Sequence, residues 1–328
     1  MAATVTIHKG FHRGRVVQNE TYELLRPYKV GANGGFVTVR SHTGDTMRIK
    51  VKSHEDYTGT ESEAVTTPSV IESDEEIMDR IEVRFGILEE MTKAAISNDI
   101  RALIVVGPPG VGKSYGVERE LEQASVFDVI ANQPPKYTVV KGALTPIGLY
   151  SVLYQYSDSN NVIVFDDSDG VFGDELSLNL LKAALDSGKR RRICWNSDSH
   201  MLRREGIPDS FDFMGAVIFI TNLNLEHVKS KKLQDHLEAL RSRCHYLDLT
   251  MNTEREKFLR IKQIHRTGKL FSGYCFAEEV GTEIIDFMET NKTKLREVSL
   301  RMALKIADLT KVSPANWKTL AKATCMVN

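Results

Sequence analysis

From residue 101 onward, short apolar runs alternate with longer stretches of helical periodicity. The runs span residues 103–106, 137–140, 162–165 and 216–220, and each is bounded by turns or charged residues. Short β-branched runs of this kind are typical of parallel strands that are buried on both faces. The stretches between them are long enough for crossover helices. The pattern therefore predicts the α/β class, with a doubly wound parallel sheet.

The sequence on either side of this region predicts four parts. Residues 1–54 form a small β-rich module, in which a hairpin turn is expected at Thr43-Gly44-Asp45. Residues 55–75 have the acidic, Ser- and Thr-rich composition of a linker. We expect an α/β domain over residues 76–250 and an α-helical domain over residues 251–328, with helices at 253–267, 276–290 and 294–312.

The net charge of −1 conceals a strong asymmetry. Residues 1–54 carry nine Lys or Arg against three Asp or Glu, whereas residues 55–79 carry nine Asp or Glu and no Lys or Arg. A basic N-terminal part can bind nucleic acid or an acidic protein, and it can equally dock on the acidic linker that follows it. At Ser73, with Glu76 three residues later, the spacing predicts a capped helix that runs to about Ser97.

A glycine-rich motif of the form GxxxxGK[ST] follows the first apolar run and precedes a helical pattern. This strand–loop–helix context predicts a P-loop, in which backbone N–H groups and a helix N-terminus surround phosphate groups. Lys113 is expected to reach the β- and γ-phosphates of a nucleotide, and Ser114 to hold Mg²⁺. The candidate nucleotide-binding residues are Gly107, Pro108, Pro109, Gly110, Val111, Gly112, Lys113 and Ser114.

Two carboxylates end the apolar run at residues 162–165. Ligands of open α/β sheets bind at the carboxyl ends of the strands, so these groups are expected beside the P-loop. We expect Asp166 to hold Mg²⁺ and Asp167 to polarise the attacking water, with Asp169 as an alternative base.

The P-loop, the apolar strand with two aspartates, and the segment Val217-Ile-Phe-Ile-Thr-Asn222 resemble, in order and spacing, the AAA+ ATPases. The resemblance covers residues 76–312, and within the family it is strongest to small bacteriophage-type members. It implies ATP and Mg²⁺ as cofactors, a C-terminal helical lid, and a ring of identical subunits, most often a hexamer. It also implies that Asn222 acts as the sensor-1 residue, which orients the attacking water together with Asp167.

The resemblance further implies two arginine roles. Arg243 lies in a Ser-Arg-Cys element similar to that of clamp-loader proteins, where the arginine enters the neighbouring subunit's ATP site; Arg241 is the second candidate. Arg301 is the sensor-2 candidate for nucleotide binding, and Arg296 is the alternative. The alternative for both sets is solvated surface arginines. The chain departs from the family at Asp167, where glutamate is usual, which leaves slow, switch-like turnover open.

Two segments are candidates for contact with a substrate. Residues 145–150 weakly resemble a pore loop that grips polypeptide, although Ile147 and Tyr150 also suit a hydrophobic core. A basic run followed by Trp195 suits a nucleic-acid contact, with phosphates on the cations and a base on the indole. The same run also suits a solvated charge cluster beside a buried tryptophan. Its cations are Lys189, Arg190, Arg191 and Arg192.

The remaining features exclude several classes of protein. The four cysteines are far apart and form no CxxC pair, so we expect reduced thiols and no zinc ribbon. The nine histidines show no metal-ligand spacing, and no apolar run is long enough for a transmembrane helix. We therefore expect a cytoplasmic ATPase, in the host cytoplasm if viral, that remodels DNA or a DNA-processing complex. The alternatives are a protein unfoldase and a slow ATP-switched assembly protein.

Overall fold

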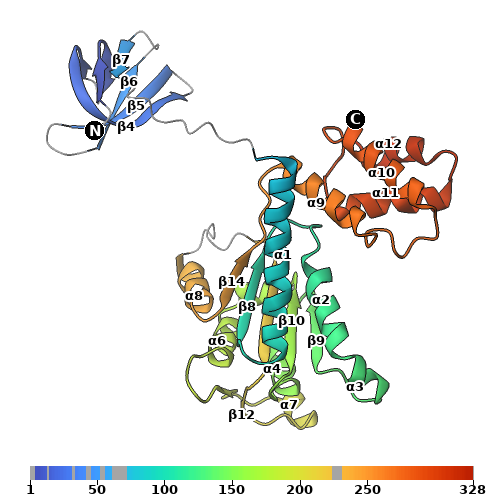
Figure 1. Cartoon of the computed structure of the whole chain (residues 1–328). Helices are drawn as coiled ribbons and strands as arrows, with labels where there is room; N and C mark the ends of the chain where they lie inside the picture. The colour runs from blue at the N-terminus through green and yellow to red at the C-terminus, as the bar shows by residue number, and fades with distance from the viewer. Residues whose placement is uncertain are drawn as a thin grey trace. The chain divides into compact units, whose positions relative to one another are not determined.

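The computed structural model describes residues 4–12, 15–31, 34–41, 46–51, 56–60, 72–223 and 231–327. The chain divides into two compact units, Met1–Glu72 and Ser73–Asn328. The two units are described separately below (Figure 1).

The first unit is a seven-stranded antiparallel sheet in the order β3-β2-β6-β5-β4-β1-β7. Alternate residues of its strands form a core of their own, with Ile7, Val37, Val39 and Ile49 fully buried. The strands are β1 (Thr4–Ile7), β2 (Gly10–His12), β3 (Arg15–Val17), β4 (Glu20–Gly31), β5 (Gly34–Arg40), β6 (Thr46–Val51) and β7 (Tyr57–Thr60).

The expected pairing of β5 with β6 is confirmed, while its turn at Thr43-Gly44-Asp45 lies outside the described residues. The expected boundary at residue 54 is too early. Strand β7 pairs with β1 along its whole length, because the acidic segment still supplies the alternating residues Tyr57–Thr60. Residues 61–71 of the expected linker lie outside the described part of the chain.

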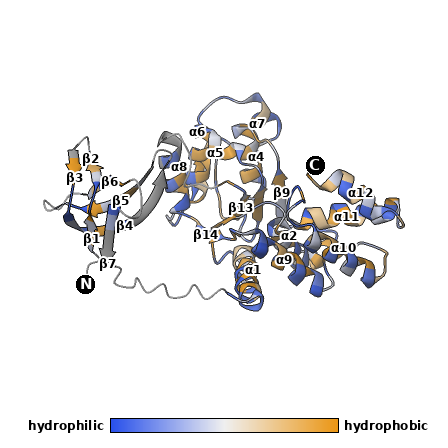
Figure 2. Ribbon diagram, turned by 90° about the horizontal axis from the view of Figure 1, so that it is seen from above, coloured by the Kyte–Doolittle hydropathy of each residue, from blue (hydrophilic) through white to orange (hydrophobic). Residues whose placement is uncertain are grey.

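The second unit is built around a five-stranded parallel sheet in the order β14-β8-β13-β10-β9. Four strands are those expected from the sequence: β8 (Ala102–Val106), β9 (Tyr137–Lys141), β10 (Val162–Asp166) and β13 (Ala216–Thr221). The fifth, β14 (His245–Asp248), pairs with β8 and was not expected, because its four residues have polar ends and no β-branched run. Apolar colouring follows the central strands between the helices (Figure 2).

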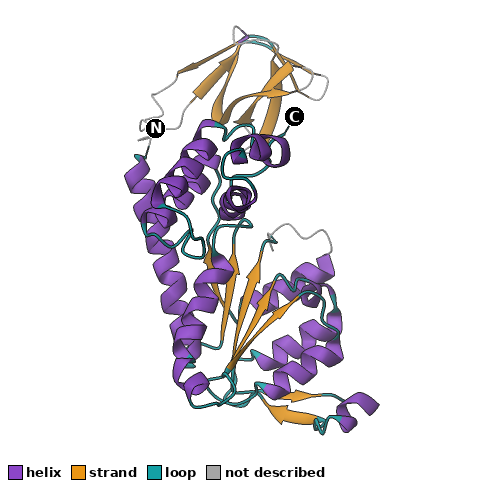
Figure 3. Cartoon of the chain, turned by 90° about the vertical axis from the view of Figure 1, so that its right-hand side faces the viewer, coloured by secondary structure: helices purple, strands orange, loops and turns teal. Residues whose placement is uncertain are grey.

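Helices cover both faces of this sheet (Figure 3). One face packs on α1 (Asp74–Ile96) and α2 (Lys113–Ala124). The other packs on α4 (Pro146–Gln155), α5 (Gly170–Gly173), α6 (Glu175–Ala184) and α8 (Lys231–Arg241). A short helix, α3 (Val126–Ile130), follows α2. The mixed α/β class with a parallel sheet between two helical layers is thus confirmed.

Helix α1 begins where the sequence predicts. The Ser73 hydroxyl accepts a hydrogen bond from the backbone N–H of Glu76, and the Glu76 carboxylate accepts one from the backbone N–H of Ser73. This reciprocal pair satisfies two backbone donors that the helix itself leaves free.

Four helices, not three, follow the sheet: α9 (Glu254–Arg266), α10 (Glu278–Thr290), α11 (Leu300–Val312) and α12 (Trp317–Cys325). They share a separate apolar core that includes Ile284, Ala303 and Trp317. The third helix starts at Leu300 and not at residue 294, because the Ser299 hydroxyl accepts a hydrogen bond from the N–H of Met302 and caps it. None of the described helices has the length and apolar character needed to cross a membrane.

Between α6 and β13 lies a segment that we call the hairpin insertion, residues 187–215. It contains β11 (Arg192–Cys194), antiparallel β12 (Ser210–Asp212) and α7 (His200–Arg204). Because it leads into the first residue of β13, it lies at the amino ends of the strands, opposite the C-terminal helices (Figure 1). All four cysteines of the chain are free thiols.

Candidate functional site

The P-loop forms the turn between β8 and α2, and two of its glycines have backbone conformations that other residues rarely adopt. Gly112 is the N-cap residue of α2 with φ of 100°, and Gly110 has φ of 71°. A Cβ atom at Gly110 would lie 2.8 Å from the Cβ of Ser299. Glycine is therefore required there both for the backbone conformation and for the close approach of α11.

Lys113, the first residue of α2, is buried under this loop. Its ammonium donates hydrogen bonds to the carbonyl oxygens of Gly107 (2.6 Å) and Pro108 (2.9 Å) and to the Asn222 Oδ1 atom (2.7 Å). Burial lowers the pKa of the Lys113 ammonium to about 8, although nearby carboxylates oppose the shift. A buried cation at a helix N-terminus is a favourable environment for phosphate groups.

Asp166 ends strand β10 and accepts a hydrogen bond from the Ser114 hydroxyl, with 2.9 Å between the oxygens. The second carboxylate oxygen of Asp166 lies 3.3 Å from the ammonium of Lys141. A serine hydroxyl and a carboxylate are hard oxygen ligands that suit Mg²⁺, which commonly takes water and phosphate oxygens for its other positions. Within the described residues there is no group of three or more His, Cys, Asp or Glu side chains arranged for a metal. The donor set fits Mg²⁺ bound together with a nucleotide.

Asp167 is linked directly to the end of strand β13. The Asn222 Nδ2 group donates a hydrogen bond to the Asp167 carboxylate (2.8 Å) while its Oδ1 atom accepts from Lys113. Asp167 has a left-handed backbone with φ of 50°, which is uncommon for a residue with a side chain. Backbone strain of this kind is concentrated at functional sites. The alternative base, Asp169, instead accepts a hydrogen bond of 2.6 Å from Thr221, and its burial raises its pKa.

A cavity of about 650 Å³ extends from the P-loop between α1 and the C-terminal helices. Arg301 lines it, as do Asp166, Asp167 and Asn222. The N-terminus of α11 contacts the P-loop directly, since the N–H of Leu300 donates to the Gly110 carbonyl at 2.8 Å. The alternative sensor-2 residue, Arg296, is exposed and is not among the lining residues. The two candidates therefore differ clearly in position.

One wall of this cavity, on α1 and α9 (Glu254–Arg266), is not indicated by any sequence pattern. The Arg260 guanidinium lies over the Phe85 ring, 3.5 Å from its centroid, and its Nη1 group donates to Gln263. Burial lowers the pKa of Arg260 to about 10. Nothing in the sequence relates Phe85 to a residue 175 positions later.

Of the two finger candidates, Arg241 ends α8 and Arg243 lies in the turn between α8 and β14. The Arg243 guanidinium donates to the Ala239 carbonyl at 2.5 Å, and among the described residues its buried Nε has no hydrogen-bond partner. Arg241 lies over the Tyr246 ring at 4.5 Å. Neither arginine lines the cavity of its own chain.

Of the two interpretations left open for Tyr150, the pore-loop role is wrong and the place in the hydrophobic core is confirmed. Its side chain is fully buried, its ring packs against Trp195 and Phe211, and its hydroxyl donates to the Pro208 carbonyl at 2.8 Å. Ile147 is partly buried against the same core. The apolar side chains of this segment therefore pack α4 against the hairpin insertion.

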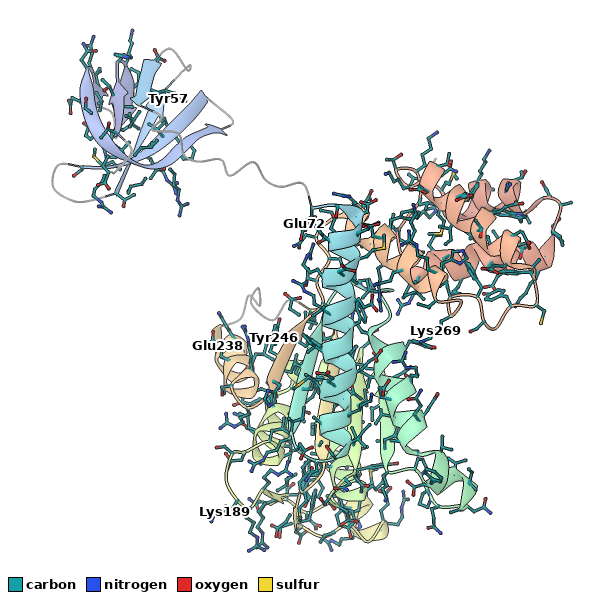
Figure 4. The ribbon with its side chains drawn as sticks, viewed as in Figure 1. Tyr57, Glu72, Lys189, Glu238, Tyr246 and Lys269 are labelled. Carbon is teal, nitrogen blue, oxygen red and sulfur yellow. The ribbon has the colours of Figure 1, made fainter. Side chains whose placement is uncertain are left out.

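The basic run of the hairpin insertion does not act as one surface either. Arg191 is only 8% exposed and donates to the carbonyl oxygens of Ala184 and Gly215, and its burial lowers its pKa to about 10. Trp195 is likewise 8% exposed, so the expected stacking of a base on it is wrong. Lys189, Arg190 and Arg192 are exposed. Lys189 lies at the opposite end of the unit from Lys269, which lines the cavity (Figure 4).

Two further residues at the carboxyl ends of the strands were missed. Lys141 ends β9 in register with Asp166, and Thr221 ends β13 beside Asn222. A usable signal was present in both, because each is a polar residue that closes an apolar run of the sequence. Parallel pairing brings such residues to the same edge of the sheet.

No family model matches the chain. The solved structure of PCH-2 from C. elegans superimposes with a TM-score of 0.30 and 14% sequence identity, covering 76% of this chain and 66% of that one. A score this low does not show a shared fold. A phage T4 protein, the uncharacterized 36.7 kDa protein of the nrdC–mobD intergenic region, is 34% identical over 326 residues, which is 97% of each chain. Identity at this level along almost the whole of both proteins shows that the chain belongs to the same family as this phage T4 protein.

Proposed function

We propose that this protein is a Mg²⁺-dependent AAA+ ATPase that hydrolyses ATP to ADP and phosphate. One observation carries the proposal: the Asn222 amide connects the buried Lys113 ammonium to the Asp167 carboxylate. A phosphate-binding cation and a candidate base are thus held by a single side chain. Ser114 and Asp166 lie beside them with the donor atoms that Mg²⁺ prefers.

The roles of the residues follow from these contacts. Lys113 and the P-loop N–H groups bind the phosphates, and Ser114 and Asp166 hold Mg²⁺, which would neutralise negative charge on the phosphate oxygens. Asp167 accepts a hydrogen bond from the attacking water and orients it, while Asn222 fixes the carboxylate. Arg301, which lines the cavity close to Gly110 of the P-loop, adds a positive charge toward the nucleotide.

The proposed assembly is a ring, most often a hexamer in this class, that functions in the cytoplasm of the infected host. Its basis is that neither Arg243 nor Arg241 lines the cavity of its own chain. An arginine supplied to a neighbouring subunit stabilises the charge that develops on the transferred phosphoryl group, which is worth roughly 10³–10⁵ in rate. Arg243 is the preferred finger, because its guanidinium already has an unsatisfied donor.

The proposed substrate is DNA or a DNA-processing complex. On the hairpin insertion, three exposed cations support this proposal: Lys189, Arg190 and Arg192. Arg190 also forms an ion pair of 2.7 Å with Asp212, and Arg192 donates to the Ser210 hydroxyl. The basic residues 1–54 offer a second contact for DNA, or alternatively for a protein partner.

A slow ATP-switched assembly protein is the second candidate, and Asp167 favours it. Aspartate is one methylene shorter than the glutamate usual in this class, and here its backbone is also held at φ of 50°. Tight nucleotide binding with slow turnover would distinguish a switch from a motor. An unfoldase that grips polypeptide with Tyr150 has no support, because that side chain is buried.

The test is steady-state ATP hydrolysis by the purified full chain and by Lys113→Ala. The variant is expected to lose nearly all activity, and full activity in it would contradict the proposal. An exposed lysine away from the cavity provides a matched control, Lys322→Ala, which should hydrolyse ATP normally. The rate is measured with and without single- and double-stranded DNA at two salt concentrations, since phosphate contacts release counterions and are salt-sensitive.

The finger in trans needs a mixing experiment. Lys113→Ala cannot use its own site, and Arg243→Ala cannot complete its neighbour's. A mixture of the two inactive variants is expected to regain part of the wild-type rate, because a Lys113→Ala subunit can supply its Arg243 to an intact P-loop. The role would belong to Arg241 if Lys113→Ala regained activity when mixed with Arg241→Ala and did not when mixed with Arg243→Ala.

A further inference from the structure

The N-terminal sheet has one face that is not used for its core. Strand register places Val16, Phe11, Lys50 and Phe36 in one row across β3, β2, β6 and β5. The next row continues with Arg48 of β6, Thr38 of β5 and Arg26 of β4. We call Phe11, Phe36, Arg26, Arg48 and Lys50 the aromatic–basic face.

Alternation along the strands shows that this face points away from the core. On β6, Ile49 is fully buried, whereas its neighbours Arg48 and Lys50 are exposed. On β5, Val37 is likewise fully buried beside Phe36, which lies outside the apolar cluster. Successive side chains of a strand point to opposite faces, so the buried set and the aromatic–basic face lie on opposite sides of the sheet.

Aromatic and cationic groups are interleaved on this face. Phe11 is 39% exposed and Val16, in the same row, is 58% exposed. The Arg48 guanidinium lies over the Phe36 ring at 5.4 Å from its centroid. Lys50 lies between the two phenylalanines, which are separated by two strand spacings, roughly 10 Å.

The charge of this face is positive. Arg26, Arg48 and Lys50 are exposed on it. Among the described residues of these strands, Glu23 lies on the same face, and Arg40 forms an ion pair with it at 3.1 Å. The face therefore keeps an excess of cations over carboxylates.

We propose that the aromatic–basic face binds single-stranded nucleic acid, with bases on Phe11 and Phe36 and phosphates on Arg48 and Lys50. Aromatic rings stack on the π-face of any base, and cations alongside them follow the backbone. A duplex keeps its bases stacked on one another, so it satisfies the cations and leaves the rings without a partner. An acidic protein segment likewise uses the cations alone. The interleaving of the two groups is what favours a single strand.

The proposal does not depend on ATP hydrolysis, and the experiment keeps the two apart. Binding of a fluorescent oligodeoxyuridylate and a fluorescent oligouridylate, each about 20 nucleotides long, is measured by anisotropy with the full chain and without ATP or ADP. We expect salt-sensitive binding that Lys113→Ala leaves unchanged. A preference between the two oligonucleotides tells DNA from RNA, because only RNA offers a 2′-hydroxyl.

Substitutions on the face test the stacking. Phe36→Leu keeps an apolar side chain but removes the ring, and it should weaken binding about tenfold. Phe36→Trp should retain binding. Circular dichroism melting checks that the variants fold, and if Phe36→Leu fails to fold, Phe11→Leu at the more exposed position replaces it. Binding by the ring-less variant as tight as that of the wild type would overturn the proposal.

A charge variant and its control test the phosphate contact. Lys50→Gln should reduce the slope of log affinity against log salt by about one. Lys292→Gln, which removes one exposed charge in the second unit, should leave that slope unchanged. Equal slopes for the two variants would overturn the proposal. The proposal would also be overturned if duplex DNA or polyglutamate bound as tightly as the single strands, or if no salt-sensitive binding were found.

Discussion

The carboxyl edge of the parallel sheet and the hairpin insertion both held candidate contact residues in the sequence, and the structure places these residues in different ways. At the carboxyl edge, Lys113, Asp167 and Asn222 come from three separate segments and meet in one hydrogen-bonded set. In the hairpin insertion, Arg191 and Trp195 come from one contiguous segment and are both buried.

The difference lies in what each pattern specifies. A P-loop motif fixes backbone geometry: Gly110 and Gly112 take positive φ values, and Lys113 begins a helix directly after a buried strand. Such a motif determines where its side chains lie. A run of cations beside a tryptophan specifies no backbone geometry. The exposure of each side chain in the run therefore depends on packing with distant residues.

Replacing Asn222 with alanine should lower kcat by about 10²–10³-fold, a loss typical when one preorganised polar contact to the reacting groups is removed. The affinity for nucleotide should change by only a few fold, because the P-loop remains. Steady-state kinetics and a separate nucleotide titration measure the two effects. Asn291→Ala, at the end of α10, is the control and should hydrolyse ATP at the wild-type rate. Unchanged kcat in Asn222→Ala would show that the contact is structural only.

Arg191→Ala should destabilise the protein by about 2–4 kcal/mol, because two buried carbonyl oxygens lose their donors and the stacking on Phe213 is lost. Arg190→Ala, one residue earlier, removes an exposed ion pair and should cost about 1 kcal/mol or less. Urea unfolding curves compare the two variants. Equal urea midpoints for the two variants would contradict this contribution of Arg191 to stability.

Arg301→Ala should weaken nucleotide binding about tenfold, as expected for a charge-assisted contact. Arg296→Ala, on an exposed residue outside the cavity, should bind within about twofold of the wild type. A fluorescent-nucleotide titration distinguishes them. A larger effect at Arg296 would reverse the assignment of the two arginines.

Nucleotide affinity should fall as the pH rises above about 8. The pKa of Lys113 is lowered to about 8 from its ordinary 10.5 by burial, so the free protein loses this positive charge above that pH. Bound phosphates favour the charged form and raise the pKa, so binding takes up a proton there. Affinity for ADP therefore falls by up to about tenfold per pH unit above this pKa and is level below it. Calorimetric titrations across this range should show the decline.

Lys113→Arg provides the comparison, since a guanidinium keeps its charge throughout the same range. Its affinity should not depend on pH above 8, whatever its absolute value. A wild-type affinity that is equally independent of pH would show that Lys113 stays charged in the free protein.

Much of the α/β fold was predictable because local signals were strong. Four of the five parallel strands and the capped start of α1 follow from apolar runs and from Ser73 with Glu76. Strand β14 was missed because its pairing with β8 depends on a contact with a distant segment and not on its own four residues. The early start expected for the third C-terminal helix arose because periodicity continued past the cap at Ser299.

The sequence by itself determined the P-loop, the order of the polar residues that end the strands, and the class of the sheet. These depend on backbone conformation and on a period of two or 3.6 residues, which are local properties of the chain. Three findings could be seen only in the tertiary structure. Asn222 connects Lys113 to Asp167. Arg301 lines the cavity and Arg296 does not, and the side chains of Tyr150 and Arg191 are buried. These findings depend on which segments pack together, because the burial of a side chain is determined by contacts with residues that are distant in the sequence.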